Sequence, residues 1–310
     1  MSLTFRPLQD RDVPGLLALW EAAGWGTLDE ATWRTWATTP HGPALVVVGL
    51  DGEDVVGQIT FTPALLDAEG GPYTAARVAA PALHPSIRGG STRSRSHPIN
   101  RLFLAGVEAA RAAGWDGIYS LPDRAWLPAF RVGVLADHFT TLAVEGARLD
   151  LGEPPPDGER AAESDGVTDA HAALWAGALR ASPASCGIRR TTAWLRYRLG
   201  GHDLFDLRDG DGLRGYAAVR RSDGLVMDAV AASEAGLAAT FRGVARTLAD
   251  RPDRPYPALK AMRIAPWRGA LAEAGFTDDD YTFVVAAGSL SDRLPPSAAD
   301  PASWYAVPAD

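Results

Sequence analysis

The period of the apolar positions changes along the chain, and each change marks a different predicted element. Residues 3–7 and 73–83 are rich in alternating apolar and β-branched positions, which predicts strands. Residues 99–113 have apolar side chains at helical spacing and are followed by Gly114, which predicts an amphipathic helix with a glycine end. The same criteria predict a hairpin over 44–50 and 55–62, strands over 117–121 and 138–144, a helix beginning near residue 10, and helices over 28–36 and 126–132.

The second half of the chain repeats this order of elements without repeating the letters. Its predicted elements are helices over 169–179 and 191–198, a hairpin over 204–208 and 213–221, a strand over 225–231, a helix over 235–249, a strand over 258–264, a short helix over 267–274 and a strand over 281–287. A fold used twice explains this repetition more economically than chance.

A proline-rich segment separates the two halves. Pro154, Pro155 and Pro156 exclude a helix and favour an extended spacer. We therefore predict a first domain over 1–150, a linker over 151–166 and a second domain over 167–310. The alternation of strands and helices predicts an α/β fold with mixed sheets of the α+β kind in each domain.

Composition narrows the classes of protein. The chain has 310 residues, of which 46% are hydrophobic and 22% charged, as in a globular protein of about two domains. The net charge of −8 argues against a nucleic-acid-binding protein. No apolar run approaches the roughly 20 residues that span a bilayer, and the first residues carry no signal-peptide pattern. These features predict a cytoplasmic protein with no membrane partner.

Cysteine and lysine are nearly missing from the composition. Cys186 stands alone, which excludes an internal disulfide and a cysteine-rich zinc site, so we expect no metal. Lys260 is the one lysine, so the basic charge is almost all arginine. Together with abundant alanine, glycine and proline, this indicates a GC-rich bacterial genome.

Residues 84–90, His-Pro-Ser-Ile-Arg-Gly-Gly, follow the strand over 73–83 and precede the amphipathic helix. Glycines let a ligand approach the backbone closely, and an arginine adds charge-assisted hydrogen bonds to phosphate oxygens. The start of a helix also attracts anions. This segment therefore predicts a cradle for a diphosphate.

The motif and the element order around it resemble those of the GNAT superfamily of N-acetyltransferases. The family pattern is an apolar residue, any residue, proline, two residues, arginine and glycine, which residues 83–89 match. The resemblance implies two GNAT-like domains in tandem and acetyl-CoA, or another acyl-CoA, as co-substrate. The cofactor-binding residues that it implies are Ala82, Leu83, Arg88, Gly89, Gly90, Ser91 and Thr92.

The chain departs from the family pattern in three places. Residues 91–98 are an insert, which is either an enlarged cradle with Arg93 and Arg95 facing the 3′-phosphate of CoA or a solvated loop. Many family members protonate the leaving thiolate with a tyrosine in the short helix that corresponds to residues 126–132. Residues 126–134 contain no tyrosine here, and Tyr119 is the nearest one. The second half has Glu234 where the cradle would lie, so we expect it to be a degenerate, non-catalytic domain.

The resemblance implies direct transfer of the acyl group to a small-molecule amine. The backbone at Ala82 or Leu83 would polarise the thioester carbonyl. His84 is the first candidate for the base that removes the amine proton, with Tyr119 as the candidate acid. Other candidates for the base are His138, Asp123 and Glu145, although Asp123 could instead cap the helix that follows it.

Two other functions fit the same sequence. One is a non-catalytic GNAT-like protein that senses acyl-CoA, and the other is a small-molecule binding or resistance protein that uses no CoA. Trp20, Trp33, Trp36 and Trp126 either line an acceptor pocket or anchor the core. The chain is expected to be a monomer or a homodimer.

Overall fold

The computed structural model describes residues 3–92, 94–131, 133–152, 158–210, 212–251 and 253–310, which form two compact units. The first unit comprises Met1–Thr141 and Ala286–Pro301, and the second comprises Leu142–Val285 and Ala302–Asp310. Each unit therefore contains a segment from the far half of the chain. Residues 153–157, with the three prolines of the predicted linker, lie outside the described residues.

The first unit is built on a mixed sheet. Its strand order is β1 (Leu3–Pro7), β4 (Leu45–Asp51), β5 (Asp54–Asp67), β6 (Tyr73–Leu83), β7 (Gly117–Ser120) and the last residues, 286–289, of β15 (Thr277–Ser289). Neighbouring strands are antiparallel except for β6 and β7, which are parallel. The predicted strands over 3–7 and 73–83 are confirmed at both ends.

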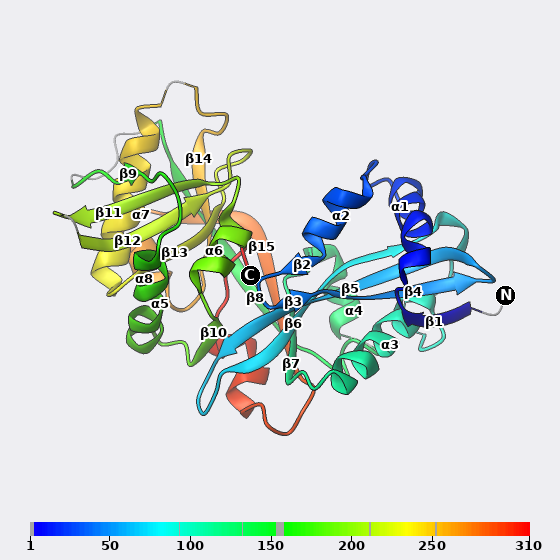
Figure 1. The fold of residues 1–310 in the computed structure, drawn as a ribbon. Helices are drawn as coiled ribbons and strands as arrows, with labels where there is room; N and C mark the ends of the chain where they lie inside the picture. Colours follow the sequence, from blue (N-terminus) through cyan, green and yellow to red (C-terminus); the bar gives the residue numbers. More distant parts are fainter. Residues whose placement is uncertain (1–2, 93, 132, 153–157, 211, 252) are drawn as a thin grey trace. The chain divides into compact units, whose positions relative to one another are not determined.

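Helices cover both faces of this sheet (Figure 1). α1 (Val13–Ala22) and α2 (Glu30–Trp36) lie on one face, where Leu16 and Leu19 pack against Val48. α3 (Pro98–Ala112) lies on the other face, where Leu102 and Phe103 pack in the core. The remaining short elements are η1 (Asp10–Asp12), β2 (Thr38–Thr39), β3 (Gly42–Pro43), η2 (Pro85–Ile87), η3 (Arg124–Trp126), α4 (Leu127–Arg131), η4 (Pro296–Ala299) and, at the boundary of the units, η5 (Pro301–Ser303).

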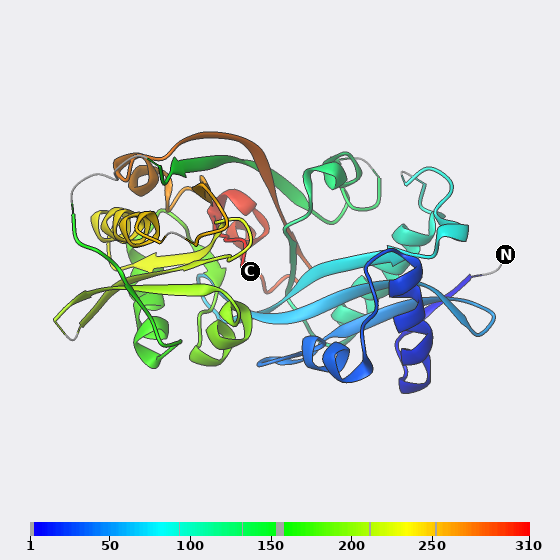
Figure 2. The ribbon, with the colours of Figure 1, turned by 90° about the horizontal axis from the view of Figure 1, so that it is seen from above.

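The second unit has its own strands and helices. The order β13-β12-β11-β9 joins β13 (Val226–Ala231), β12 (Gly212–Val219), β11 (Asp203–Asp209) and β9 (Ala162–Glu163), and β14 (Ala258–Met262) pairs with β8 (Thr140–Asp150). Figure 2 shows α7 (Glu234–Ala249) on one side of the four-stranded sheet β13-β12-β11-β9 and α5 (Asp169–Ala181) and α6 (Thr192–Leu199) on the other. α8 (Arg268–Glu273) packs against α7.

The contacts of β8 and β15 do not follow the order of the chain. Residues 146–150 of β8 pair with β14 and belong to the second unit, although the predicted division assigns them to the first domain. The end of β15 pairs with β7 and belongs to the first unit. An antiparallel strand fits the edge of either sheet, so hydrophobic pattern alone does not decide which sheet it joins.

One short pairing was not predicted. β10 (Cys186–Ile188) lies in a predicted loop and pairs in parallel with β16 (Trp304–Tyr305). Cys186 is free and buried. Arg190, which follows β10, is buried between Asp228 (3.4 Å) and Asp310 (3.0 Å) and stacks over Trp175. This charge cluster belongs to the core of the second unit.

Candidate functional site

The parallel strands β6 and β7 of the first unit separate before β6 ends. Their pairing runs from Ala75 with Gly117 to Arg77 with Tyr119, whereas β6 continues to Leu83. Backbone groups without a neighbouring strand have to bond to water, to side chains or to a ligand. An extended ligand with amide groups can therefore bind here like an added strand.

A β-bulge lies in β6 at this separation. Gln58 of β5 faces Ala82 and Thr60 faces Ala79, so Ala80 and Pro81 together oppose one residue of β5. Ala80 has a φ of 51° and is the one non-glycine residue with positive φ in the described part of the chain. The buried Gln58 side chain donates from Nε2 to the Ala80 carbonyl at 3.1 Å. This bond offsets part of the roughly 1–2 kcal/mol that the left-handed conformation costs.

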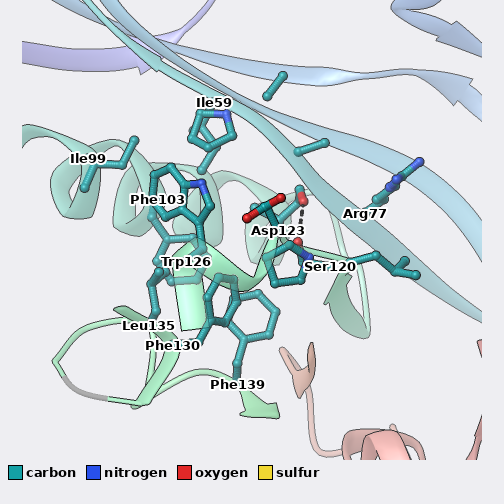
Figure 3. Close-up of a pocket in the computed structure, with 16 residues that line it drawn as sticks. Ile59, Arg77, Ile99, Phe103, Ser120, Asp123, Trp126, Phe130, Leu135 and Phe139 are labelled. Atoms are coloured by element: carbon teal, nitrogen blue, oxygen red, sulfur yellow. Dashed lines mark hydrogen bonds between the residues drawn. The ribbon is translucent and has the colours of Figure 1, made fainter. Parts of the chain in front are cut away.

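A cavity of about 270 Å³ opens beside the bulge. Figure 3 shows its apolar part, where the rings of Phe103, Trp126, Phe130 and Phe139 gather. The backbone wall is formed by 77–81 of β6 and 120–123 at the end of β7. The arrangement provides an open, largely apolar space next to backbone groups that can form hydrogen bonds.

Polar side chains line the other part of the cavity. Ser120 Oγ donates to the Val78 carbonyl at 2.9 Å, where the two strands separate. Asp123 is the one acidic residue among those that line the cavity, and its Oδ1 accepts the N–H of Ala125 at 2.8 Å. The predicted capping role of Asp123 is therefore confirmed, and the cap fixes the carboxylate at the mouth of the cavity (Figure 3).

The predicted cradle forms an exposed turn after β6. Arg88 points back toward the protein, because its Nε donates to the Leu83 carbonyl at 2.8 Å and its Nη2 to the Ala23 carbonyl at 3.4 Å. Gly90 has a φ of 103°, a conformation that glycine adopts at little cost. Arg88 thus holds the base of the turn while both glycines stay exposed.

The insert that follows is held against the start of α3. Asn100 Nδ2 donates to the carbonyls of Thr92 and Ser94, both at 2.7 Å. Arg95 forms an exposed ion pair with Asp137 at 2.6 Å. Arg93 lies outside the described residues. Side-chain bonds to backbone carbonyls therefore order the part of the insert that the structure describes.

The two residues predicted as catalytic do not line the cavity. His84 caps η2, with Nδ1 at 2.7 Å from Ser86 Oγ. Tyr119 is 1% exposed and precedes Ser120, so the alternation of strand side chains directs it to the opposite face of the sheet.

The alternative candidates for the base lie in different parts of the chain. Glu145 lies exposed on β8 in the second unit. His138 is stacked edge-on against Phe103, and burial lowers the pKa of its imidazole, as does the charge of Arg111. Of the candidates considered, Asp123 is the one whose side chain lines the cavity.

Sequence reasoning missed Gln58 and the aromatic lining. One signal was present for the bulge, since Pro81 lies inside a predicted strand and proline in a strand is typical of a bulge or an edge. Nothing comparable marks Phe103, Phe130 and Phe139, which come from separate segments and read as ordinary core residues. Of the four tryptophans considered, Trp126 lines the cavity.

The described residues contain neither a cluster of metal ligands nor a membrane-spanning helix. No three His, Cys, Asp or Glu side chains lie close enough together there to hold a metal ion. Within the same residues, every helix is too short or too polar to cross a bilayer.

Comparison with known proteins gives a structural likeness only. No protein-family model and no curated protein matches the chain. A GCN5-related N-acetyltransferase from Anabaena variabilis has a TM-score of 0.68 at 12% identity, covering 94% of this chain and 73% of that one. Another from Kribbella flavida has a TM-score of 0.65 at 16% identity, covering 92% and 70%.

A third solved structure is described as a tandem protein. It is a tandem GNAT protein from the clavulanic acid biosynthesis pathway, with a TM-score of 0.56 at 19% identity, covering 94% of this chain and 99% of that one. At such identities the likeness concerns the fold. The chain therefore has the tandem GNAT fold, with the mixed α/β sheets that its element order predicts.

Proposed function

We propose that the first unit is an acyl-CoA-dependent N-acyltransferase that transfers an acyl group, most simply acetyl, to the amine of a small molecule. The observation that carries this proposal is the cavity at the separation of β6 and β7, beside the bulge at Ala80. A thioester with an amide-containing arm needs both an apolar space and backbone partners. This place supplies both.

The parts of the donor have distinct partners in this proposal. The apolar lining takes the acyl group and the thioester, while the backbone of 79–81 bonds to the amides of the arm. The exposed turn with Arg88, Gly89 and Gly90 faces the diphosphate, and Ser91 and Thr92 extend it. Ala82 and Leu83 connect the bulge to this turn.

Transfer needs one new bond, one broken bond and two proton movements. The neutral amine attacks the thioester carbonyl carbon, the N–C bond forms, the C–S bond breaks and the thiolate leaves. Asp123 accepts the proton that the amine loses, since its carboxylate is at the mouth of the cavity. The thiolate takes its proton from solvent, because neither Tyr119 nor any other tyrosine lines the cavity. His84, the first candidate for the base, keeps a capping role.

A second function is supported by one specific observation. The cavity offers no tyrosine to protonate a leaving thiolate, which suits a protein that binds acyl-CoA and senses it without turnover. Acyl-CoA binding is common to both functions. Thiol release in the presence of a panel of amines separates them.

Calorimetric titration with acetyl-CoA and longer acyl-CoA tests the proposal. Leu135→Trp enlarges a side chain that lines the cavity and should abolish binding, whereas Ala125→Trp, at an exposed position outside the lining, should leave the dissociation constant unchanged. Thermal unfolding checks that both variants are folded. Equal affinity of Leu135→Trp and the parent protein would place the donor elsewhere and overturn the proposal.

A further inference from the structure

The first turn of helix α3 has its backbone donors already bonded. Pro98 has no N–H, and the N–H of Ile99 donates to His97 Nδ1 at 3.3 Å. The N–H groups of Asn100 and Arg101 both donate to the His97 carbonyl, at 3.0 and 3.1 Å. The dipole of the helix still favours an anion, but an anion has to find its hydrogen-bond donors elsewhere.

The side chain of His97 supplies such a donor. It is 5% exposed, and its Nε2 has no hydrogen-bond partner among the described residues. Because Nδ1 accepts a backbone N–H, the proton of the neutral ring is on Nε2. A buried donor without a partner costs about 1–3 kcal/mol, so a ligand that accepts this bond gains affinity.

The edge of the imidazole that carries Nε2 faces the glycine turn. A Cβ placed on Gly90 would lie 3.7 Å from His97 Cδ2, the carbon bonded to Nε2. A Cβ on Gly89 would meet nothing within 4 Å. Nε2 itself is out of contact with solvent, so a ligand reaches it by displacing part of the turn. Glycines make that displacement easier, since no side chain obstructs the approach.

The charge of this segment fits an oxyanion. Residues 84–101 contain Arg88, Arg93, Arg95 and Arg101 and no acidic residue, although the whole chain has a net charge of −8. Arg95 is paired with Asp137, so among the described residues Arg88 and Arg101 carry the excess positive charge, which attracts phosphate groups.

We propose that His97 Nε2 donates a hydrogen bond to the diphosphate of the acyl-CoA and takes over the role that helix amides would otherwise have. This assignment rests on the proposed function of the first unit. The 3′-phosphate of CoA is a second oxyanion of the same ligand, and dephospho-CoA distinguishes the two.

His97→Asn and His97→Ser test the proposal, because both keep an oxygen that can cap the N–H of Ile99 while both remove Nε2. Calorimetry should show acetyl-CoA and dephospho-CoA binding about tenfold more weakly, which corresponds to the loss of one hydrogen bond to a charged group. An acetyl-pantetheine thioester, which has no phosphate, should bind unchanged. His202→Asn is the matched control, since His202 is a half-buried histidine of the second unit.

The other outcomes each overturn the assignment in a distinct way. Unchanged affinity for acetyl-CoA in both His97 variants excludes the contact, while the proposed function stands on binding by the parent protein. Weakening of acetyl-CoA but not of dephospho-CoA assigns His97 to the 3′-phosphate. Equal weakening of the phosphate-free thioester means that the change acts on the cavity. If the parent protein binds neither acetyl-CoA nor inorganic pyrophosphate, both the proposed function and this site fail.

Nuclear magnetic resonance of nitrogen-labelled histidine tests binding in the parent protein itself, without a binding measurement on a variant. The Nε2 signal of His97, identified by its loss in His97→Asn, should shift when acetyl-CoA or inorganic pyrophosphate is added to the parent protein. The signals of His202, in the second unit, should stay in place. A His97 signal that ignores both ligands would contradict the proposal.

Discussion

The two units differ where a strand that precedes a long helix meets a parallel neighbour. In the first unit this place is the cavity between β6 and β7. In the second unit β13 and β14 meet at the bridge between Leu225 and Lys260. There, the hydroxyl of Tyr305 donates to the Ala229 carbonyl of β13 at 2.7 Å and accepts from Trp267 Nε1 at 2.9 Å. Bonded aromatic side chains fill the second site.

The turns that follow these strands differ in the same sense. After β6 the chain has the exposed glycines and arginine of residues 88–90, whereas after β13 Ser233 caps α7 and Glu234 is in its first turn. The hollow beside the second turn measures about 80 Å³, against about 270 Å³ in the first unit. The comparison teaches that one order of elements supports either a binding cavity or a packed core, depending on side-chain size and charge.

The largest expected effect comes from the tryptophans at the two sites. Trp267→Ala should lower the free energy of unfolding by about 3–5 kcal/mol, because the indole is fully buried and bonded to Tyr305. Trp126→Ala, at a partly exposed position of the cavity wall, should lower it by roughly 1 kcal/mol and weaken acyl-CoA binding. Urea unfolding followed by circular dichroism measures the first effect and calorimetry the second. Loss of acyl-CoA affinity in Trp267→Ala at a temperature where it is folded would break the comparison.

Next in size is the effect of the acidic residue at each turn. Asp123→Asn keeps the cap oxygen for Ala125 but removes the base, so kcat should fall about 100-fold or more with little change in acyl-CoA affinity. Glu234→Gln is the matched carboxylate-to-amide change in the second unit and should leave kcat unchanged. Thiol release under saturating amine and acyl-CoA gives both values. An unchanged kcat for Asp123→Asn would remove Asp123 from the chemistry.

A smaller effect concerns the side chain that bonds to a carbonyl of the central strand in each unit. Gln58→Met removes the bond to the Ala80 carbonyl, and Tyr305→Phe removes the bond to the Ala229 carbonyl. Each should lower the free energy of unfolding by about 1 kcal/mol. Only Gln58→Met should also reduce kcat, because the bulge that it holds forms the cavity wall. Equal kcat in both variants would reduce Gln58 to a structural residue.

The sequence carried most of the fold but little of the site. The spacing of apolar residues predicted the bounds of β6 and α3 to within one residue, since both elements are long and have a regular apolar pattern. The exchange of β8 and β15 between the units depends on contacts far apart in the chain, which no local pattern reports. The cavity could not be predicted for the same reason, because Phe103, Phe130 and Phe139 come together only after folding. The turn at Gly89 and Gly90 could be predicted from the sequence, because the glycines and the arginine that mark it are neighbours in the chain.

The smallest expected effect is on pH dependence and comes from one half-buried histidine in each unit. Burial lowers the pKa of His138 and of His202, and neighbouring arginines lower both further. A base whose pKa is lowered by folding binds fewer protons in the folded than in the unfolded protein, so stability rises with pH. The contribution is complete above the ordinary pKa of about 6.5 and is lost as the pH falls below it.

Variants at each histidine then show whether the two units share this behaviour. His138→Gln and His202→Gln should each flatten the rise in the free energy of unfolding that occurs below about pH 6.5, and the double variant should flatten it most. Urea unfolding at a series of pH values gives the slopes. The effects should add, because the two side chains lie in different units and contact different arginines. A slope that steepens in either variant would mean that the histidine is charged in the folded protein, which would overturn the assignment of its burial as the dominant influence.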